Sequence, residues 1–470
     1  MNRRKIFGFM LGPVLGGVLS LLSIPLLAWH FHPEEIGRNG VFQIFLSFSL
    51  MIFSLGLDQA YVREYHEAED RQGLFKKCFS VGFVLLVIVV FATIPFFEKI
   101  SKFLYGEANL AWHLLTCGCL LLSFASRFFS LVVRMQERGL AYSMSQILPK
   151  LALLGLVLIY VAAGAGKNYE NLLYANFFAL LVTTVIFGIN SRADWMPKAE
   201  GGWDKKEIKR LLSFGLPLVG SGLIYWALSA TSVLALRTFS GFKEVAIYSM
   251  AMNFAGIGVL LQSIFSTIWM PTVYKWVATK QDLAKIEIVT NHVLLLICLL
   301  FSLVGLFAWT IDYVVPVAYL EVKFIVVCCM AQPLLYTLSE ATVVGLNIQK
   351  KTSYSLIASA AAFVTNVVLC LLLVPRHGAA GAAVANAFSY FVFLIARTEL
   401  SCLVWQKIRR RHIYTTILIF LIIGSCMAFG EVGEKLYAAR VLWLIAFPVA
   451  FIRVVGIFYK YASNRSIEYP

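Results

Sequence analysis

Apolar runs of roughly 20 residues, separated by short polar segments, follow one another along the whole chain. A helix rises about 1.5 Å per residue, so each run is long enough to cross a hydrocarbon layer about 30 Å thick. The runs lack the alternation of a barrel strand, which leaves helices as the spanning element. The pattern predicts an all-α membrane protein with fourteen spans, at residues 6–30, 40–61, 78–97, 110–133, 145–163, 171–190, 212–236, 245–268, 288–310, 322–346, 354–374, 379–403, 413–429 and 441–459.

The composition agrees, because 60% of the residues are hydrophobic and only 14% are charged. This balance excludes a soluble fold, and the spans leave too little chain for a sizeable soluble domain. The net charge of +15 arises mainly from Lys and Arg in alternate loops, which is typical of the cytoplasmic side of membrane proteins. We therefore expect a multi-pass protein with both termini in the cytoplasm, and the charge indicates no nucleic-acid partner.

An internal repeat organises the spans. The segment LSFASRFFSLVVRMQER at 122–138 lies over LYTLSEATVVGLNIQKK at 335–351, so that Arg127 corresponds to Glu340. Spans one to six thus repeat as seven to twelve, with two spans appended, which predicts lobes at 1–200 and 201–407 and an appended pair at 408–470. Two copies with the same membrane orientation are related by a pseudo-twofold axis along the membrane normal. Lobes related in this way can open a shared cleft to either side in turn, which favours transport.

Four segments of the chain form a recognisable combination: PLLAWHFHPEEIGRNGVFQ at 25–43, SLGLDQAYVREYHE at 54–67, FGLPLVGSGLIYW at 214–226 and AIYSMAMNFAGI at 246–257. Together they resemble the polysaccharide (O-antigen type) flippase family. That family is grouped with the multidrug and toxin extrusion transporters and the peptidoglycan-precursor flippases, so the resemblance implies their fold. It also implies movement of an undecaprenyl-diphosphate-linked oligosaccharide to the outer leaflet of the bacterial inner membrane. A polysaccharide polymerase and a chain-length regulator are the partners that it implies.

Cationic side chains inside the spans are the first candidates for contact with such a diphosphate, because charges there are costly. Arg127 lies about 9 Å inside the fourth span, and Arg134 and Arg138 follow on the same helical face. With Arg63 and Lys150 they would form a basic funnel open to the cytoplasm. The simpler alternatives are that Arg127 and Lys150 extend to the membrane surface and that Arg134 and Arg138 are ordinary loop charges.

Carboxylates inside or near the spans are candidates for ion coupling or for a gate. Glu340 is deep in the tenth span, where a carboxylate needs a cation or a proton. It could pair with Arg127 across the cleft, pair with Arg397 in its own lobe, or couple transport to protons or sodium. Arg397 is also a candidate for the substrate site. Asp58 and Glu64, at the inner end of the second span, could form an inner gate or simply a solvated helix end.

Other functions are less compatible with the sequence. No Gly-rich phosphate-binding loop is present, so no nucleotide cofactor is expected, and no metal-ligand pattern appears among the Cys, His and acidic residues. A membrane polymerase or glycosyltransferase would need an acid–base constellation in a large loop, and the outer loops are short, so we expect no enzyme activity. A peptidoglycan-precursor flippase and a multidrug exporter remain as alternatives.

Overall fold

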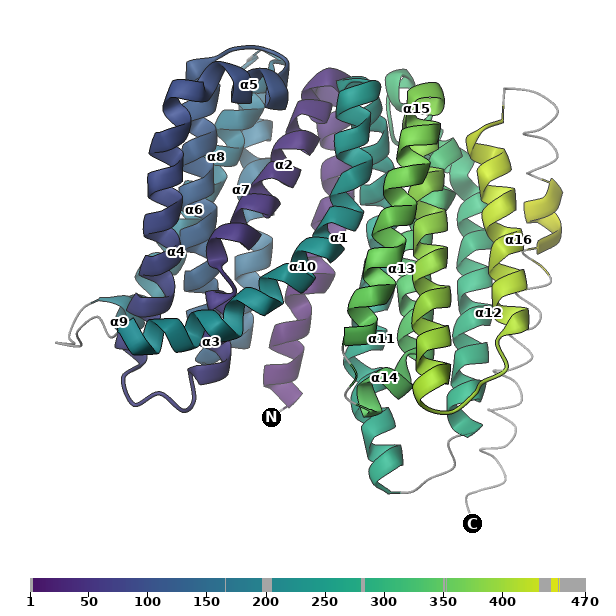
Figure 1. Cartoon of the computed structure of the whole chain (residues 1–470). Coiled ribbons are helices and arrows are strands. Elements are labelled where there is room, and N and C mark those ends of the chain that lie inside the picture. The colour runs from purple at the N-terminus through teal and green to yellow at the C-terminus, as the bar shows by residue number, and fades with distance from the viewer. Residues whose placement is uncertain are drawn as a thin grey trace. The chain divides into compact units, whose positions relative to one another are not determined.

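The computed structural model describes residues 3–164, 166–196, 205–279, 284–349, 351, 353–430, 441–446 and 448. All the regular secondary structure in these residues is helical, which confirms the predicted all-α class (Figure 1). The chain divides into two compact units, Met1–Trp226 and Ala227–Pro470. The division falls inside one long helix, whereas the sequence places the lobe boundary before it.

The first unit is built on long helices joined by short ones. They are α1 (Arg3–His30), α2 (Pro33–Ser54), α3 (Leu57–Glu64), α4 (Arg71–Thr93), η1 (Ile94–Phe96), α5 (Phe97–Tyr105), α6 (Leu110–Met135), α7 (Gly139–Ala162), α8 (Tyr169–Asn190), α9 (Arg192–Trp195) and the first part of α10 (Lys205–Phe239). The helix α1 packs on α7, and α6 packs on α8. A buried core joins α3, α4 and α6 to Leu211 of α10, so this part of α10 belongs to the first unit.

The second unit surrounds one buried helix, α13. Its elements are the rest of α10, α11 (Phe242–Ala278), α12 (Ala284–Phe307), η2 (Ala308–Tyr313), η3 (Val317–Tyr319), α13 (Val322–Thr342), α14 (Val344–Ile348), α15 (Ser353–Val404) and α16 (Arg411–Ala428). The helices α11, α12, α15 and α16 all pack against α13. Most of α13 is buried in consequence, and side chains on it face other helices on nearly every side.

Twelve helices in the described residues are long and apolar enough to cross a membrane. The helix α15 counts once among them, although Gly378 interrupts it with non-helical angles (φ 48°, ψ −128°). Its two arms match the predicted eleventh and twelfth spans, so the described chain contains predicted spans one to thirteen. Large apolar side chains such as Leu22, Ile159 and Leu372 are more than half exposed, as a lipid-facing surface requires. The predicted fourteenth span, 441–459, lies mostly outside the described residues.

The turn within α15 has a local cause. Pro375 cannot donate a helical hydrogen bond, and Gly378 has a positive φ that residues with a Cβ rarely adopt. The amide N–H of Ala379 opens the second arm and donates to the Glu244 carboxylate of α11 at 2.7 Å. Glu244 therefore acts as an N-terminal cap supplied by another helix.

The predicted second span, 40–61, is wrong at its inner end. The helix α2 stops at Ser54, and Leu55 and Gly56 both have positive φ angles of 51° and 69° before α3 begins. At this break Gly56 meets Gly215 of α10 backbone to backbone, and a Cβ on Gly215 would lie 2.6 Å from the Leu55 carbonyl oxygen. The break turns α3 out of the line of α2 and changes which way its side chains point.

The predicted arginine face of the fourth span is also wrong in part. The helix α6 ends at Met135, and Glu137 has a positive φ of 57°. Arg138 is consequently the residue that precedes α7, and its guanidinium donates to the side chain and the carbonyl of Asn190. Only Arg127 and Arg134 share α6.

Candidate functional site

An ion pair inside the first unit joins α6 to α3. The Nη2 of Arg127 lies 3.1 Å from Oδ2 of Asp58, and Nε2 of Gln59 donates to the same oxygen at 3.1 Å. The helix α6 continues for two turns after Arg127, which places this residue about 12 Å from the helix end. The Asp58 side chain is 11% exposed and that of Arg127 is 39% exposed. The arginine is thus held by one carboxylate and remains open on its other side.

The open side of Arg127 borders a cavity of about 540 Å³ within the first unit. The cavity lies among α2, α3, α6 and the first part of α10. Its wall contains both polar and apolar groups. The wall is formed by Ser47, Leu50, Met51, Ser54, Gly56, Asp58, Gln59, Arg127, Leu218, Val219 and Gly222. Among the described residues, one of the five N–H donors of Arg127 is hydrogen-bonded to a protein partner, the Asp58 carboxylate. Four donors are therefore available to a ligand.

Arg63 and Glu64 lie on α3 near this cavity but do not line it. The guanidinium carbon of Arg63 is 4.4 Å from the centre of the Phe214 ring, a cation–π contact, and its side chain is exposed. Glu64 pairs with Arg210 of α10 at 2.8 Å. Both contacts tie α3 to the start of α10.

Lys150 reaches a backbone group instead of the cavity. Its Nζ donates to the carbonyl oxygen of Gly16 at 2.7 Å and to Oγ of Ser20 at 2.5 Å, both on α1. Lys150 is not among the residues that line the cavity, and its contact with a substrate stays a prediction. The ammonium instead links α7 to α1 in the part of the unit where these two helices pack.

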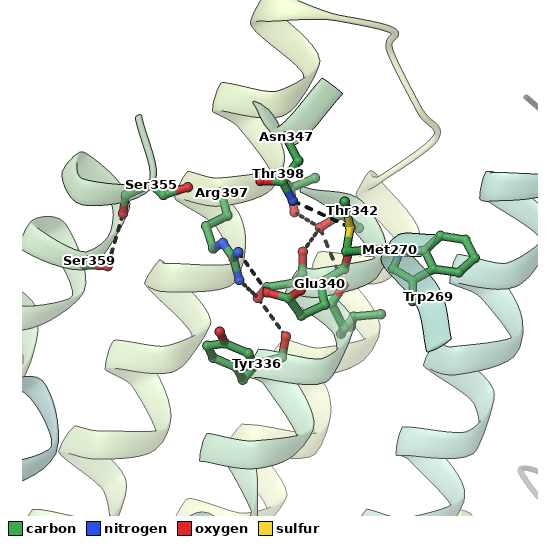
Figure 2. A network of polar contacts seen from close by, with 12 residues as sticks. Trp269, Met270, Tyr336, Glu340, Thr342, Asn347, Ser355, Ser359, Arg397 and Thr398 are labelled. Atoms are coloured by element: carbon green, nitrogen blue, oxygen red, sulfur yellow. Dashed lines mark hydrogen bonds and ion pairs between the residues drawn. The ribbon is translucent and has the colours of Figure 1, made fainter. Parts of the chain in front are cut away.

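A second ion pair lies inside the second unit. The Nη2 of Arg397 lies 2.9 Å from Oε1 of Glu340, and its Nη1 donates to Oγ of Ser339 at 2.7 Å. Figure 2 shows Arg397 of α15 directed at Glu340 of α13, with the Tyr336 ring beside it. The guanidinium carbon is 5.4 Å from the Tyr336 ring centre and 5.0 Å from that of Phe393. Of the partners that the sequence suggests for Glu340, Arg397 is the one that forms an ion pair with it in the structure.

This second pair is closed to solvent. The side chains of Arg397 and Glu340 are 8% and 11% exposed, and Trp269 of α11 donates its indole N–H to the Glu340 carbonyl at 3.1 Å. A hydrogen bond between Thr342 and Thr398 at 2.7 Å continues the contact between α13 and α15 (Figure 2). Contact of Arg397 with a substrate stays a prediction, and it would require this pair to open.

Comparison with known proteins identifies the family. A family model described as polysaccharide biosynthesis protein matches residues 3–277, which is more than half of the chain. The chain belongs to the polysaccharide biosynthesis protein family. This confirms the family resemblance that the four sequence segments indicated.

Relatives and solved structures agree with this assignment. The probable low-salt glycan biosynthesis flippase Agl15 of Haloferax volcanii is 21% identical to this polysaccharide biosynthesis protein, over 83% of this chain and 81% of the relative. The lipid II flippase MurJ in an inward closed conformation gives a TM-score of 0.70 at 11% identity, over 98% of this chain and 100% of that chain. An inward-facing multidrug resistance MATE family transporter of the MOP superfamily gives 0.60 at 15% identity, over 86% and 96%. These likenesses confirm the expected superfamily fold.

The sequence of this polysaccharide biosynthesis protein indicated Asp58 as a candidate gate residue. It did not indicate that Asp58 pairs with Arg127. The reason is the break at Leu55 and Gly56, which redirects α3 after a span that the sequence predicts to be continuous. The serines on the cavity wall, Ser47 and Ser54, were missed as well, because small polar residues give no signal inside an apolar run. In the part of the chain that the structure describes, no group of three His, Cys, Asp or Glu is placed to hold a metal ion.

Proposed function

We propose that this protein is a flippase for an undecaprenyl-diphosphate-linked oligosaccharide. It would move the repeat unit from the cytoplasmic to the periplasmic leaflet of the bacterial inner membrane by alternating access, for O-antigen, capsule or exopolysaccharide assembly. The observation that carries this proposal is the position of Arg127, on the wall of a cavity of about 540 Å³, with four N–H donors that no described residue accepts.

The chemistry of the cavity suits a diphosphate with sugars attached. An arginine fork can hold two phosphate oxygens at once, and its charge does not depend on pH in the physiological range. Without substrate, Asp58 balances this charge inside the protein. When a phosphate binds, its oxygens would satisfy the free donors of Arg127, while Gln59 and the wall serines would hydrogen-bond to hydroxyl groups. The polyprenyl tail would remain among lipids, since an undecaprenyl chain is far too long for this cavity.

Three carboxylates would have further roles in the cycle. We place Asp58 and Glu64 in an inner gate, because they hold α3 to α6 and to α10 through Arg127 and Arg210. Glu340, with Arg397, would be the site of coupling to a proton or sodium gradient, since protonation or ion binding would release a buried pair. No chemical step on the glycan is required, so the protein would be a transporter and not an enzyme. A polymerase and a chain-length regulator would use its product at the outer leaflet.

Deletion of the gene, followed by analysis of lipid-linked oligosaccharides in each leaflet, tests this function. Completed units should accumulate on the cytoplasmic side, and the wild-type gene should restore export. Accumulation of the lipid precursor of peptidoglycan instead would indicate the peptidoglycan-precursor flippase. Normal glycan export with a new sensitivity to cationic drugs would indicate a multidrug exporter, and either result would contradict the proposal.

A further inference from the structure

A basic pocket in the second unit lies far along the chain from the Arg127 cavity and has no role in the proposed transport. It occupies about 590 Å³ where the connection after α15 meets the start of α16. This volume is within the range of about 300–1,000 Å³ that small-molecule sites have. Three consecutive arginines, Arg409, Arg410 and Arg411, line it together with His412.

The place of this pocket in the fold sets it at a membrane surface. The helix α15 ends at Val404 and α16 begins at Arg411, and both are long and apolar enough to cross the membrane. The few residues between them must therefore lie where the hydrocarbon layer ends. The positive charge of this loop predicts the cytoplasmic side, where the leaflet carries anionic lipids.

Among the described residues, one of the three arginines is held by a doubly hydrogen-bonded carboxylate. Arg410 forms a double contact with Glu399, at 2.5 Å from Nε and 2.7 Å from Nη2, and the Tyr414 hydroxyl donates to the same carboxylate at 2.9 Å. The hydrogen bonds from Arg410 to Glu399 raise the pKa of Arg410, so this arginine stays charged. The pair balances itself and forms a fixed wall of the pocket.

The remaining cations exceed the remaining carboxylates. Arg409 is 89% exposed and lies 3.9 Å from Glu287 of α12, at the limit of an ion pair. Arg411 is exposed, and among the described residues it has no ion-pair partner. His412 is held by Asn291 of α12 at 2.8 Å. The pocket thus presents two exposed guanidinium groups beside one that is held by a carboxylate, an arrangement that can bind phosphate oxygens with several N–H donors.

We propose that this pocket binds the phosphate group of an anionic phospholipid of the surrounding membrane. The fixed pair of Arg410 and Glu399 shapes the site, and Arg409 and Arg411 supply the donors. The acyl chains of a bound lipid would extend along the apolar surface of α16, where Ile419 and Ile422 are about half exposed. This site is separate from the transported substrate, and the proposal holds whatever glycan the protein moves.

Thermal unfolding of the purified full-length protein tests the proposal. Unfolding midpoints would be measured in phosphatidylcholine nanodiscs and in nanodiscs with 20–30% phosphatidylglycerol, for the wild type, for R409Q/R411Q and for K205Q/K209Q. The last variant removes the same charge from exposed lysines of α10 that do not line the pocket. Phosphatidylglycerol should raise the midpoint of the wild type and of K205Q/K209Q, and R409Q/R411Q should lose at least half of this increase.

Two further arms decide what is bound. Inorganic phosphate added to phosphatidylcholine nanodiscs should give less than a quarter of the increase, because a free ion lacks the acyl anchor. An equal increase in the unfolding midpoint with inorganic phosphate would contradict a lipid ligand and would indicate that the pocket binds a soluble phosphate. A full increase in R409Q/R411Q, or an equal loss in K205Q/K209Q, would overturn the site itself. Transport of the glycan by R409Q/R411Q is a separate readout, so failure here would leave the proposed function standing.

Discussion

The two ion pairs within the spans differ in how deeply their side chains are buried. Arg127 and Glu340 occupy corresponding positions in the predicted repeat and have opposite charges. In the first unit Arg127 is 39% exposed beside a cavity, and its pair with Asp58 uses one donor. In the second unit Glu340 and Arg397 are buried between Tyr336, Phe393 and Trp269.

This contrast favours one pair as the contact for the proposed substrate. A charge that is balanced and covered by aromatic rings contributes to a ligand site only after a costly rearrangement. A charge that keeps free donors on a cavity wall needs none. We therefore propose that the diphosphate would bind at Arg127. For Glu340 and Arg397 we propose a role inside the second unit, structural at rest and available for coupling.

The largest expected effect comes from breaking the closed pair. Glu340→Ala leaves the Arg397 guanidinium buried without its carboxylate, which should lower the free energy of unfolding by about 3–5 kcal/mol. The double variant Glu340→Leu with Arg397→Leu should recover most of that loss, because it removes both charges. Thermal unfolding in detergent measures both. A loss below about 1 kcal/mol for Glu340→Ala would show that the pair is not closed as described.

The same site carries the coupling proposal. Glu340→Gln keeps the size of the side chain and removes its charge, so export should lose its dependence on the ion gradient while the protein still assembles. Transport in vesicles with and without a proton or sodium gradient measures this. Unchanged gradient dependence would contradict a coupling role for Glu340.

The next largest effect concerns the backbone contact that positions α3. Gly56→Ala adds a Cβ at a positive φ and against Gly215, and should destabilise the protein by about 1–3 kcal/mol. Gly220→Ala is the matched control on α10, because nothing lies within 4 Å of its Cβ position. The control should be neutral or stabilising by up to about 1 kcal/mol. Equal unfolding midpoints for the two variants would rule out the close contact.

Removal of the carboxylate from the partly exposed pair of Asp58 and Arg127 should lower the free energy of unfolding less than its removal from the buried pair of Glu340 and Arg397. Asp58→Asn leaves Arg127 without a counter-charge, but the cavity admits water to the guanidinium, so we expect a loss of about 1 kcal/mol. Thermal unfolding beside Glu340→Gln compares the two pairs directly. A larger loss for Asp58→Asn would reverse the contrast between them.

An effect on stability of similar size, with little effect on export, is expected at Lys150. Lys150→Met keeps the length of the side chain and loses the hydrogen bonds to Gly16 and Ser20. Stability should fall by about 0.5–1.5 kcal/mol, and export should remain within a factor of about two of the wild type. Loss of export at unchanged stability and expression would place Lys150 in the substrate site after all.

Much of the fold follows from hydropathy, because a helix that spans a membrane must be long and apolar. The sequence predicted every span in the described chain and both arms of α15, whose turn is marked by Pro375 and Gly378. It also included Arg397 among the partners of Glu340. These features depend on local composition or on charges that cannot stay unpaired in an apolar helix.

The features that were missed depend on contacts between distant segments. The break between α2 and α3 is stabilised where Gly56 meets Gly215, and it is this break that brings Asp58 to Arg127. Lys150 donates a hydrogen bond to a backbone carbonyl on α1, and no pattern in the sequence predicts this contact. The end of α6 at Met135 likewise removes Arg138 from the face that helical spacing predicts.

The most direct test of the account compares two arginines of the same helix. Arg127 lines the cavity, whereas Arg134 is exposed near the end of α6 over the Tyr142 ring at 5.7 Å. In a deletion strain, Arg127→Ala should cut export of lipid-linked oligosaccharide by at least tenfold, because charge-assisted hydrogen bonds contribute about 1.5–3 kcal/mol each. Arg134→Ala should export normally at equal membrane abundance. Normal export by Arg127→Ala, with completed units reaching the outer leaflet, would contradict the central claim.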